Sequence, residues 1–340
     1  MSRVTLKDVA AKAGVSYQTV SKVLNGQMQV AEETEARIWQ TITDLDYRPN
    51  VSARNLRTQA SNLLGHALPG DAAQAYHPIL VQFMISVANA AEQQGYHLLS
   101  FVTGNNDFYD HQAYDQLYAR NQVAGFILSN TTQNDPRIPY LLERVIPFCS
   151  FGRANDAWDF CWVDVDGQHG IELAASHLLD LGHQRIGFIT WPEGSQTGWY
   201  REQGYLLTLQ AAGVAVDPQW ITRGNNSAQV GARAMSQLLA LPAAARPTAV
   251  ICVSDLMAIG AMNAIAAAGL NVGQDIAVTG FDDIPMVEYL HTPLTSVRQP
   301  IQEIGHYVVD LVIRQIRGLP IEQKGVLFKP ELVIRASSHT

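Results

Sequence analysis

The sequence has few cysteines, no long apolar run and no recognisable export signal. Its 340 residues include three cysteines, whose positions fit neither a disulfide framework nor a zinc site. No apolar stretch approaches the roughly 20 residues that a membrane-spanning helix needs. The first residues, MSRVTLKD, are polar and lack the apolar core of a secretory signal. We therefore expect buried, reduced thiols, a cytoplasmic location, no contact with a membrane and no metal site.

Motifs of enzymes and cofactor-binding proteins are also missing. The chain has no Walker phosphate loop, no dinucleotide-binding glycine motif after its first predicted strand, no zinc-protease motif and no nucleophile elbow. Ser195 lies between Gly194 and Gly198, but this spacing does not match an elbow. The sequence therefore predicts a protein that is not an enzyme and that holds no cofactor.

Charge is distributed unevenly along the chain. Residues 1–60 hold eight basic and six acidic side chains, whereas the whole protein has a formal net charge of −8. A mildly basic head on an acidic body fits a small anion-binding module attached to a larger domain. The length suggests two or three domains. We expect a small head over 1–48, a linker over 49–61 and a body over 62–340.

The head is predicted to contain two short helices joined by a tight turn. Thr5 and Asp8 have capping-box spacing, Gly14 permits a sharp turn, and Ser16 can cap the helix that follows. This pattern is typical of a helix-turn-helix, and a third helix over 32–45 would close its core. The second helix turns hydrogen-bonding side chains outward: Tyr17, Gln18, Ser21 and Lys22. Such side chains can reach base edges in a major groove. A helical bundle without a DNA-binding role is the alternative.

The body alternates strand-like and helix-like runs. This alternation predicts parallel sheets with helices on both faces, and about ten strands divide more easily over two sheets than over one. We expect an N-subdomain of about 62–162 and 293–322, and a C-subdomain of about 163–292 and 323–340. The last strand is predicted over 326–334. Ligands of such folds bind beyond the carboxyl ends of the strands.

Several motifs together resemble the lactose-repressor (LacI/GalR) family of transcriptional regulators. In the head they are 4–10 (VTLKDVA), 13–16 (AGVS), 19–21 (TVS) and 45–50 (LDYRPN). In the body they are 181–186 (LGHQRI), 201–205 (REQGY), 254–260 (SDLMAIG), 280–283 (GFDD) and 293–300 (PLTSVRQP). The resemblance covers essentially the whole chain. It implies an α/β protein with a three-helix head and a periplasmic-binding-protein-like body of two doubly wound parallel-sheet subdomains.

The resemblance also implies which residues contact DNA. Residues 51–60 correspond to the family's hinge helix, and Leu56 stands where a leucine wedge opens the central base step in the minor groove. A solvated linker is the alternative for this segment. Lys22 replaces an arginine of many members and lacks the bidentate fork that suits guanine. The expected DNA-binding residues are Thr5, Leu6, Ser16, Tyr17, Gln18, Thr19, Ser21, Lys22, Asn25, Tyr47, Asn50, Ala53, Arg54 and Leu56.

An effector site is expected between the two halves of the body. Asp282 at a strand end and Arg201 on a helix can hold vicinal sugar hydroxyls through charge-assisted hydrogen bonds. An ion pair that merely fixes the strand ends is the alternative. Asn226 replaces an aromatic residue of some relatives, and Ser254 replaces an asparagine. The expected effector-binding residues are Tyr76, His77, Trp162, Ser195, Thr197, Arg201, Asn226, Ser254 and Asp282.

Aromatic residues near this predicted site favour a saccharide effector. Trp162 matches an aromatic position at the junction of the halves, and Trp191, Trp199 and Tyr200 lie just before Arg201. Aromatic faces rimmed by polar groups suit the C–H surfaces of sugars. This composition favours a disaccharide or glycoside over a purine, although each ring taken singly is more often part of a core.

These features together predict a sequence-specific transcriptional regulator, expected to be a repressor, whose operator affinity depends on a small molecule. Two subunits would place two recognition helices on a pseudo-palindromic DNA operator. The chain stops at Thr340 without a trailing leucine heptad, so we expect a homodimer. Two alternatives stay open: a periplasmic-type sugar-binding protein without a DNA-binding role, and a nucleobase-responsive regulator.

Overall fold

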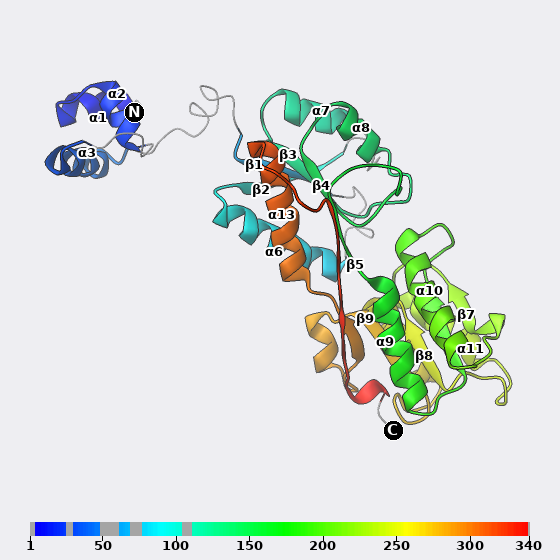
Figure 1. The fold of residues 1–340 in the computed structure, drawn as a ribbon. Coiled ribbons are helices and arrows are strands. Elements are labelled where there is room, and N and C mark those ends of the chain that lie inside the picture. Colours follow the sequence, from blue (N-terminus) through cyan, green and yellow to red (C-terminus); the bar gives the residue numbers. More distant parts are fainter. Residues whose placement is uncertain (1–3, 25–29, 48–60, 69–76, 104–110, 339–340) are drawn as a thin grey trace. The chain divides into compact units, whose positions relative to one another are not determined.

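The fold was derived from a computed structural model that describes residues 4–24, 30–47, 61–68, 77–103 and 111–338 (Figure 1). The chain divides into two compact units, residues 1–61 and residues 62–340. Among the described residues, no helix combines the length and apolar character needed to cross a membrane.

The first unit contains three helices, α1 (Leu6–Ala13), α2 (Tyr17–Leu24) and α3 (Glu32–Asp44). The Asp8 carboxylate accepts hydrogen bonds from the backbone N–H and the Oγ1 of Thr5, both at 2.7 Å. These bonds hold the pKa of Asp8 below its usual value. Ser16 Oγ accepts from the Thr19 N–H at 3.1 Å and so caps α2. The predicted caps therefore define both helix starts.

A small apolar core holds these helices together. It contains Val9 from α1, Val20 and Val23 from α2, Ile38 from α3 and the ring of Tyr47. Outside the core, Arg37 Nε donates to the Ala13 carbonyl at 3.1 Å, where a cation satisfies the exposed C-terminal end of α1.

The second unit contains two six-stranded sheets, with strand orders β11-β5-β4-β3-β1-β2 and β12-β10-β9-β8-β6-β7. All pairings are parallel except that of β10 with β12. The strands of the first sheet are β1 (Leu63–Leu68), β2 (His97–Val102), β3 (Gly125–Leu128), β4 (Phe148–Phe151), β5 (Trp162–Val165) and β11 (Gly325–Phe328). Those of the second are β6 (Ile186–Thr190), β7 (Ile221–Arg223), β8 (Ala249–Cys252), β9 (Ala277–Asp282), β10 (Thr295–Arg298) and β12 (Glu331–Val333).

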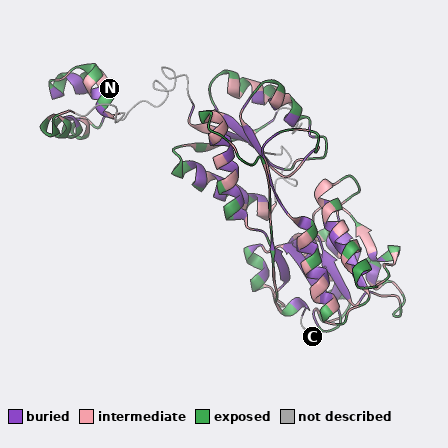
Figure 2. Cartoon of the chain, viewed as in Figure 1, coloured by how far each residue is buried: buried purple, intermediate pink, exposed green. Residues whose placement is uncertain are grey.

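Helices cover both sheets. Those that follow strands of the first sheet are α6 (Pro78–Gln93), α7 (His111–Ala119) and α8 (Arg137–Glu143), and α13 (Ile301–Arg317) packs beside α6 (Figure 1). The second sheet is accompanied by α9 (Gly167–Asp180), α10 (Gln196–Ala211), α11 (Ala228–Leu239) and α12 (Asp255–Ala267). The strands are mostly buried, while the helices expose one side (Figure 2). Every residue of β3, β6 and β8 is buried, as expected for central parallel strands.

The positions at which the chain passes from one sheet to the other differ from the predicted subdomain boundaries. Strand β10 belongs to the second sheet, although 293–322 was expected in the N-subdomain, and β5 lies wholly in the first sheet. The strand predicted over 326–334 is two strands in different sheets, β11 and β12. Pro330 separates them because it has no N–H with which to continue a ladder. Apolar runs identify a strand but do not identify its neighbour.

The three cysteines are buried and free, as expected from the sequence. Burial raises the pKa of each thiol. Protonated, buried thiols are unreactive, so they serve as small apolar residues of the core.

Val145, between α8 and β4, is in an unfavourable backbone conformation. Its φ is 54°, and 84% of the residue is exposed. A β-branched side chain in the left-handed region is strained, and little packing would be lost on its removal. We expect Val145→Gly to raise the free energy of unfolding by up to about 1 kcal/mol in urea titrations. Val102→Gly, at an exposed position of β2, should lower it, since glycine weakens a strand. A lower free energy of unfolding for Val145→Gly than for the wild type would contradict the strain at Val145.

Candidate functional site

A cavity of about 700 Å³ lies in the second unit, lined by residues at or after strand ends of both sheets. Segments after β3, β6 and β7 contribute, as do the last residues of β4, β5 and β9. This is where parallel α/β folds bind ligands, and the volume falls within the range of about 300–1,000 Å³ typical of small-molecule sites. Six predicted effector residues line it: His77, Ser195, Thr197, Arg201, Asn226 and Asp282.

Arg201 presents a buried positive charge to this cavity. It lies on α10 and is only 4% exposed. Its Nη1 donates to the Val253 carbonyl, and its guanidinium carbon lies 3.5 Å from the centroid of the Phe281 ring. Burial lowers the pKa of Arg201 to about 10, against the opposing effect of nearby carboxylates, so the group stays charged at neutral pH. Its Nε is buried without a hydrogen-bond partner among the described residues.

Asp282 supplies the negative charge of the cavity at the end of β9. Its Oδ1 accepts from Gln299 Nε2 at 2.6 Å. Burial raises the pKa of Asp282 to about 6, although the Arg201 charge and the Gln299 hydrogen bond favour the carboxylate. No ion pair forms between Arg201 and Asp282 within 4.0 Å, although both are described. The ion-pair alternative is therefore not what the structure shows, and both groups keep hydrogen-bonding capacity for a ligand.

The turn after β9 is held by buried polar contacts. Asp282 has a φ of 116° and Asp283 a φ of 51°, both in the region that favours glycine. Asp255, at the start of α12, accepts from the Ile284 N–H at 2.8 Å and from Ser296 Oγ at 2.5 Å. Asp283 is paired with Arg298 Nε at 2.7 Å and also with Arg335. This network stabilises a strained backbone and thereby positions the Asp282 side chain.

Ser254 contributes to the cavity only through a neighbour. It is fully buried and caps α12, because its Oγ accepts from the Met257 N–H at 3.3 Å. The same Oγ lies 2.5 Å from Asn226 Oδ1, and Asn226 Nδ2 lies 3.0 Å from His77 Nδ1. Ser254 is thus one bond removed from the cavity lining, contrary to its predicted direct contact with the effector.

Trp162 does not line the cavity, unlike the position expected for it from the sequence. It begins β5 opposite Gly325, and a side chain at Gly325 would meet its ring. The cavity receives Asp164 and Val165, from the other end of the same strand. Of the other predicted aromatic residues, Trp191 lines the cavity, and the Tyr200 ring stacks under the guanidinium of Arg153 at 3.6 Å. Tyr76 lies outside the described residues.

Several lining residues escaped the sequence analysis. All of them lie at the end of a strand or just after one, so strand ends are the signal that would have found them: Ser129, Asn130, Thr131, Phe151, Asp164, Asn225 and Gln299. Asp164 pairs with Arg153 Nε at 2.9 Å.

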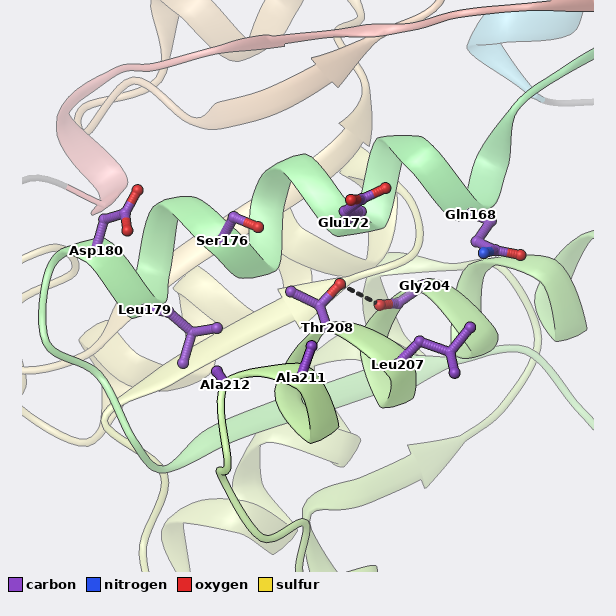
Figure 3. A pocket seen from close by; sticks show the side chains of 10 residues that line it. All are labelled: Gln168, Glu172, Ser176, Leu179, Asp180, Gly204, Leu207, Thr208, Ala211 and Ala212. Carbon is purple, nitrogen blue, oxygen red and sulfur yellow. Dashed lines mark hydrogen bonds between the residues drawn. The ribbon is translucent and has the colours of Figure 1, made fainter.

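A second hollow of about 400 Å³ lies between α9 and α10 (Figure 3). Leu179 and Leu207 face it, with the carboxylates of Glu172 and Asp180 on α9. Thr208 Oγ1 turns away to its own helix, donating to the Gly204 carbonyl at 2.7 Å. No predicted effector residue lines this hollow. No group of three metal-ligating side chains occurs in the described part of the chain.

The recognition side of the head is partly described. On α2, Tyr17, Gln18 and Lys22 are exposed and Ser21 is half-buried. Ser16 and Thr19 bond to each other at 2.8 Å as part of the cap, and Tyr47 is 8% exposed because its ring fills the core. Thr5 caps α1, and Leu6 packs against the same core. The remaining predicted DNA-binding residues lie outside the described ranges: Asn25, Asn50, Ala53, Arg54 and Leu56.

A helix-turn-helix unit joined to a two-sheet body with a small-molecule-sized cavity defines a ligand-responsive DNA-binding protein. Residues 5–50 match the profile of bacterial regulatory proteins of the lacI family, and residues 175–338 match that of a periplasmic binding protein-like domain. The chain belongs to the LacI family of bacterial regulatory proteins. It is a DNA-binding transcriptional regulator with the predicted α/β architecture, which confirms the resemblance found in the sequence.

Relatives and solved structures match over nearly the full chain. The transcriptional repressor PurR of Aliivibrio fischeri strain MJ11 is 30% identical over 334 residues, 98% of each chain. The lac repressor dimer bound to operator and the anti-inducer ONPF is 28% identical, with a TM-score of 0.83 over all of both chains. The transcriptional regulator CelR in complex with cellobiose is 29% identical, with a TM-score of 0.74 over 98% of this chain and 100% of CelR.

Proposed function

We propose that the protein is a repressor that binds a pseudo-palindromic operator as a homodimer and is controlled by a saccharide in the cavity. The observation that carries the effector part is the buried Arg201, with a donor still unpaired, in the same cavity as Asp282. Fixed charged groups of opposite sign can bind neighbouring hydroxyls, one accepting from Arg201 and one donating to Asp282. The repressor assignment is supported by the PurR and lac repressor relatives.

The composition of the lining favours a saccharide. Hydroxyl and amide side chains from four segments that follow strands surround Arg201 and Asp282, and Trp191 and Phe151 add aromatic surface. Many donors and acceptors beside two aromatic rings suit a polyhydroxylated ligand. CelR, which is similar over the whole chain, holds cellobiose. A nucleobase is the second candidate, because the PurR repressors are 29–33% identical to this chain.

The proposed dimer is supported by an exposed apolar surface of the body. Val81 and Ile85, one turn apart on α6, are 47% and 58% exposed, and Val102 on β2 is 56% exposed. Helix α6 packs against β2, so these exposed residues lie on neighbouring elements. Apolar patches of this kind mark protein–protein contacts.

Fluorescence anisotropy with a duplex selected from random DNA tests the proposal. The protein is titrated at two salt concentrations, alone and with cellobiose, lactose, guanine or adenine. We expect two chains per duplex and a shift of operator affinity by one sugar of about 5–150-fold, a typical allosteric coupling. If only a base shifts the operator affinity, the effector is a nucleobase and not a saccharide. Binding that is salt-sensitive but blind to sequence would overturn the operator-binding role.

Gln18 is expected to read bases. It is exposed on α2, beside the equally exposed Tyr17. Gln18→Ala should reduce discrimination at one or two operator positions by about 1–3 kcal/mol, measured by competition with singly substituted duplexes. Gln40→Ala, an equally exposed glutamine on α3, is the control and should leave every position unchanged. Uniform weakening over all duplexes by Gln18→Ala would instead make Gln18 a phosphate contact.

A further inference from the structure

A chain of hydrogen bonds runs from the core of the second sheet to the first strand-to-helix loop of the first sheet. Ser254 Oγ lies 2.5 Å from Asn226 Oδ1, and Asn226 Nδ2 lies 3.0 Å from His77 Nδ1. Ser254 caps α12, Asn226 precedes α11, and His77 caps α6 of the other sheet. Two of these side chains, His77 and Asn226, line the cavity. The bond between them therefore crosses the cavity from one sheet's elements to the other's.

The direction of the hydrogen bonds in this relay follows from Ser254. Its hydroxyl has one proton and already accepts from the Met257 N–H, in a fully buried position. Donation to Asn226 Oδ1 satisfies that proton, whereas the flipped amide would leave it without an acceptor, at a cost of about 1–3 kcal/mol. The amide nitrogen of Asn226 must then face His77. Because an amide nitrogen only donates, His77 Nδ1 is the acceptor and carries no proton.

The environment keeps His77 neutral in this arrangement. Burial lowers its pKa. The charged groups that line the same cavity are Asp164, Arg201 and Asp282, and Asp164 is already paired with Arg153. A neutral imidazole with an unprotonated Nδ1 has its proton on Nε2. The Nε2 of His77 has no hydrogen-bond partner in the described ranges and is not sealed from solvent.

We propose that Ser254 and Asn226 are positioning residues that fix His77 as a hydrogen-bond donor through Nε2, and that this donor selects effectors with an acceptor oxygen or nitrogen at that side of the cavity. This inference rests on the proposed role of the cavity as the effector site. Sugar hydroxyl and ring oxygens qualify, as do base carbonyls. A ligand that presents a cationic donor there is rejected, because two donors face each other.

Histidine NMR of the full-length chain tests the relay without any effector. The protein is labelled with [¹⁵N]histidine, and the His77 signal is assigned by its loss in His77→Gln. At pH 7.5 we expect an unprotonated Nδ1 and a protonated Nε2. Asn226→Asp offers His77 an acceptor in place of a donor, so Nδ1 should gain a proton and the pKa of His77 should rise by about 1–3 units.

Asn225→Asp is the matched control for charge. Asn225 lines the same cavity next in sequence, and it makes no hydrogen bond to His77. Asn225→Asp should leave His77 Nδ1 unprotonated at pH 7.5, and it should shift the pKa of His77 less than Asn226→Asp does. Equal spectra for the two variants, or a protonated Nδ1 in the wild type, would overturn the relay.

Calorimetry with cellobiose and with guanine tests the selection of effectors. For the probe that the wild type binds, His77→Leu should weaken binding at least tenfold, about 1.4 kcal/mol. His77→Gln keeps a donor and should recover binding to within about threefold. Equal binding by His77→Leu and wild type would refute the donor role while leaving the effector site intact. The expected NMR pattern without binding of either probe would support the relay and refute the proposed effector class.

Discussion

Replacing Gly260 by alanine is expected to lower the free energy of unfolding of the body by about 3 kcal/mol. Gly260 lies where α12 crosses α11, and a side chain there would overlap the Ala228 carbonyl oxygen and lie 2.8 Å from the Ala232 nitrogen. Gly231 of α11 makes the reciprocal close approach to Met257. Backbone atoms cannot move aside as a rotamer can, so the cost lies at the upper end of the range for overpacking.

The same substitution should disturb the cavity, because α11 begins at its lining and the cap of α12 bonds to a lining residue. Ser227 caps α11 and Ser254 caps α12, and Asn226 lies between their ends. Urea titration followed by circular dichroism measures the loss of stability. Asn263→Ala, on the exposed side of α12, is the control and should raise stability slightly, since alanine favours helix. Unchanged stability of Gly260→Ala would show that the two helices do not pack as closely as described.

Asp282→Asn is expected to weaken effector binding about 100-fold and to leave effector-free operator affinity unchanged. The amide removes the charge from a hydrogen bond to the ligand, and charge-assisted bonds contribute about 1.5–3 kcal/mol. It also removes one of the three carboxylates that oppose the buried charge of Arg201. Calorimetry and anisotropy give the two affinities. Asp156→Asn removes the same charge at an exposed position. This control should alter neither effector affinity nor operator affinity. A normal effector response in Asp282→Asn would remove Asp282 from the site.

The raised pKa of Asp282 predicts two effects of pH, one on effector binding and one on the free energy of unfolding. Effector binding that needs the carboxylate should decline as the pH falls through about 6. Stability should change in the opposite sense. Because the folded-state pKa lies above the usual value, protonation favours the folded state, and the contribution of Asp282 to the free energy of unfolding rises as the pH falls from about 6 toward 4. Asp282→Asn should therefore be more stable than wild type at pH 7.5 and lack this dependence. A steeper pH dependence in the variant would contradict the assignment.

Local patterns predicted the head and the strands well. The caps at Thr5 and Ser16 act between residues three apart, so their spacing in the sequence is also their spacing in the helix. The sheets expected from the alternation of strand-like and helix-like runs are present. The motifs around 201–205 and 280–283 placed Arg201 and Asp282 in one cavity, as the resemblance implied.

Two of the predicted site residues pack into apolar cores. The ring of Tyr47 lies in the core of the head, and the ring of Trp162 packs against a core of the body. Trp162 stands at the amino end of β5, two residues from the Asp164 that reaches the cavity. Ligands bind beyond the carboxyl ends of parallel strands, and Trp162 misses the cavity because β5 begins with it.

The sequence by itself determined the helix-turn-helix, the alternation of strands and helices, and the membership of the LacI family. These depend on residues close together in the chain or on motifs in fixed order. Only the tertiary structure decided which strands join which sheet, and which polar groups are paired. His77 and Asn226 are 149 residues apart, and Gly260 meets a helix that begins 32 residues before it. A hydrogen bond or a steric contact depends on distance in space, and that distance exists only once the sheets have formed.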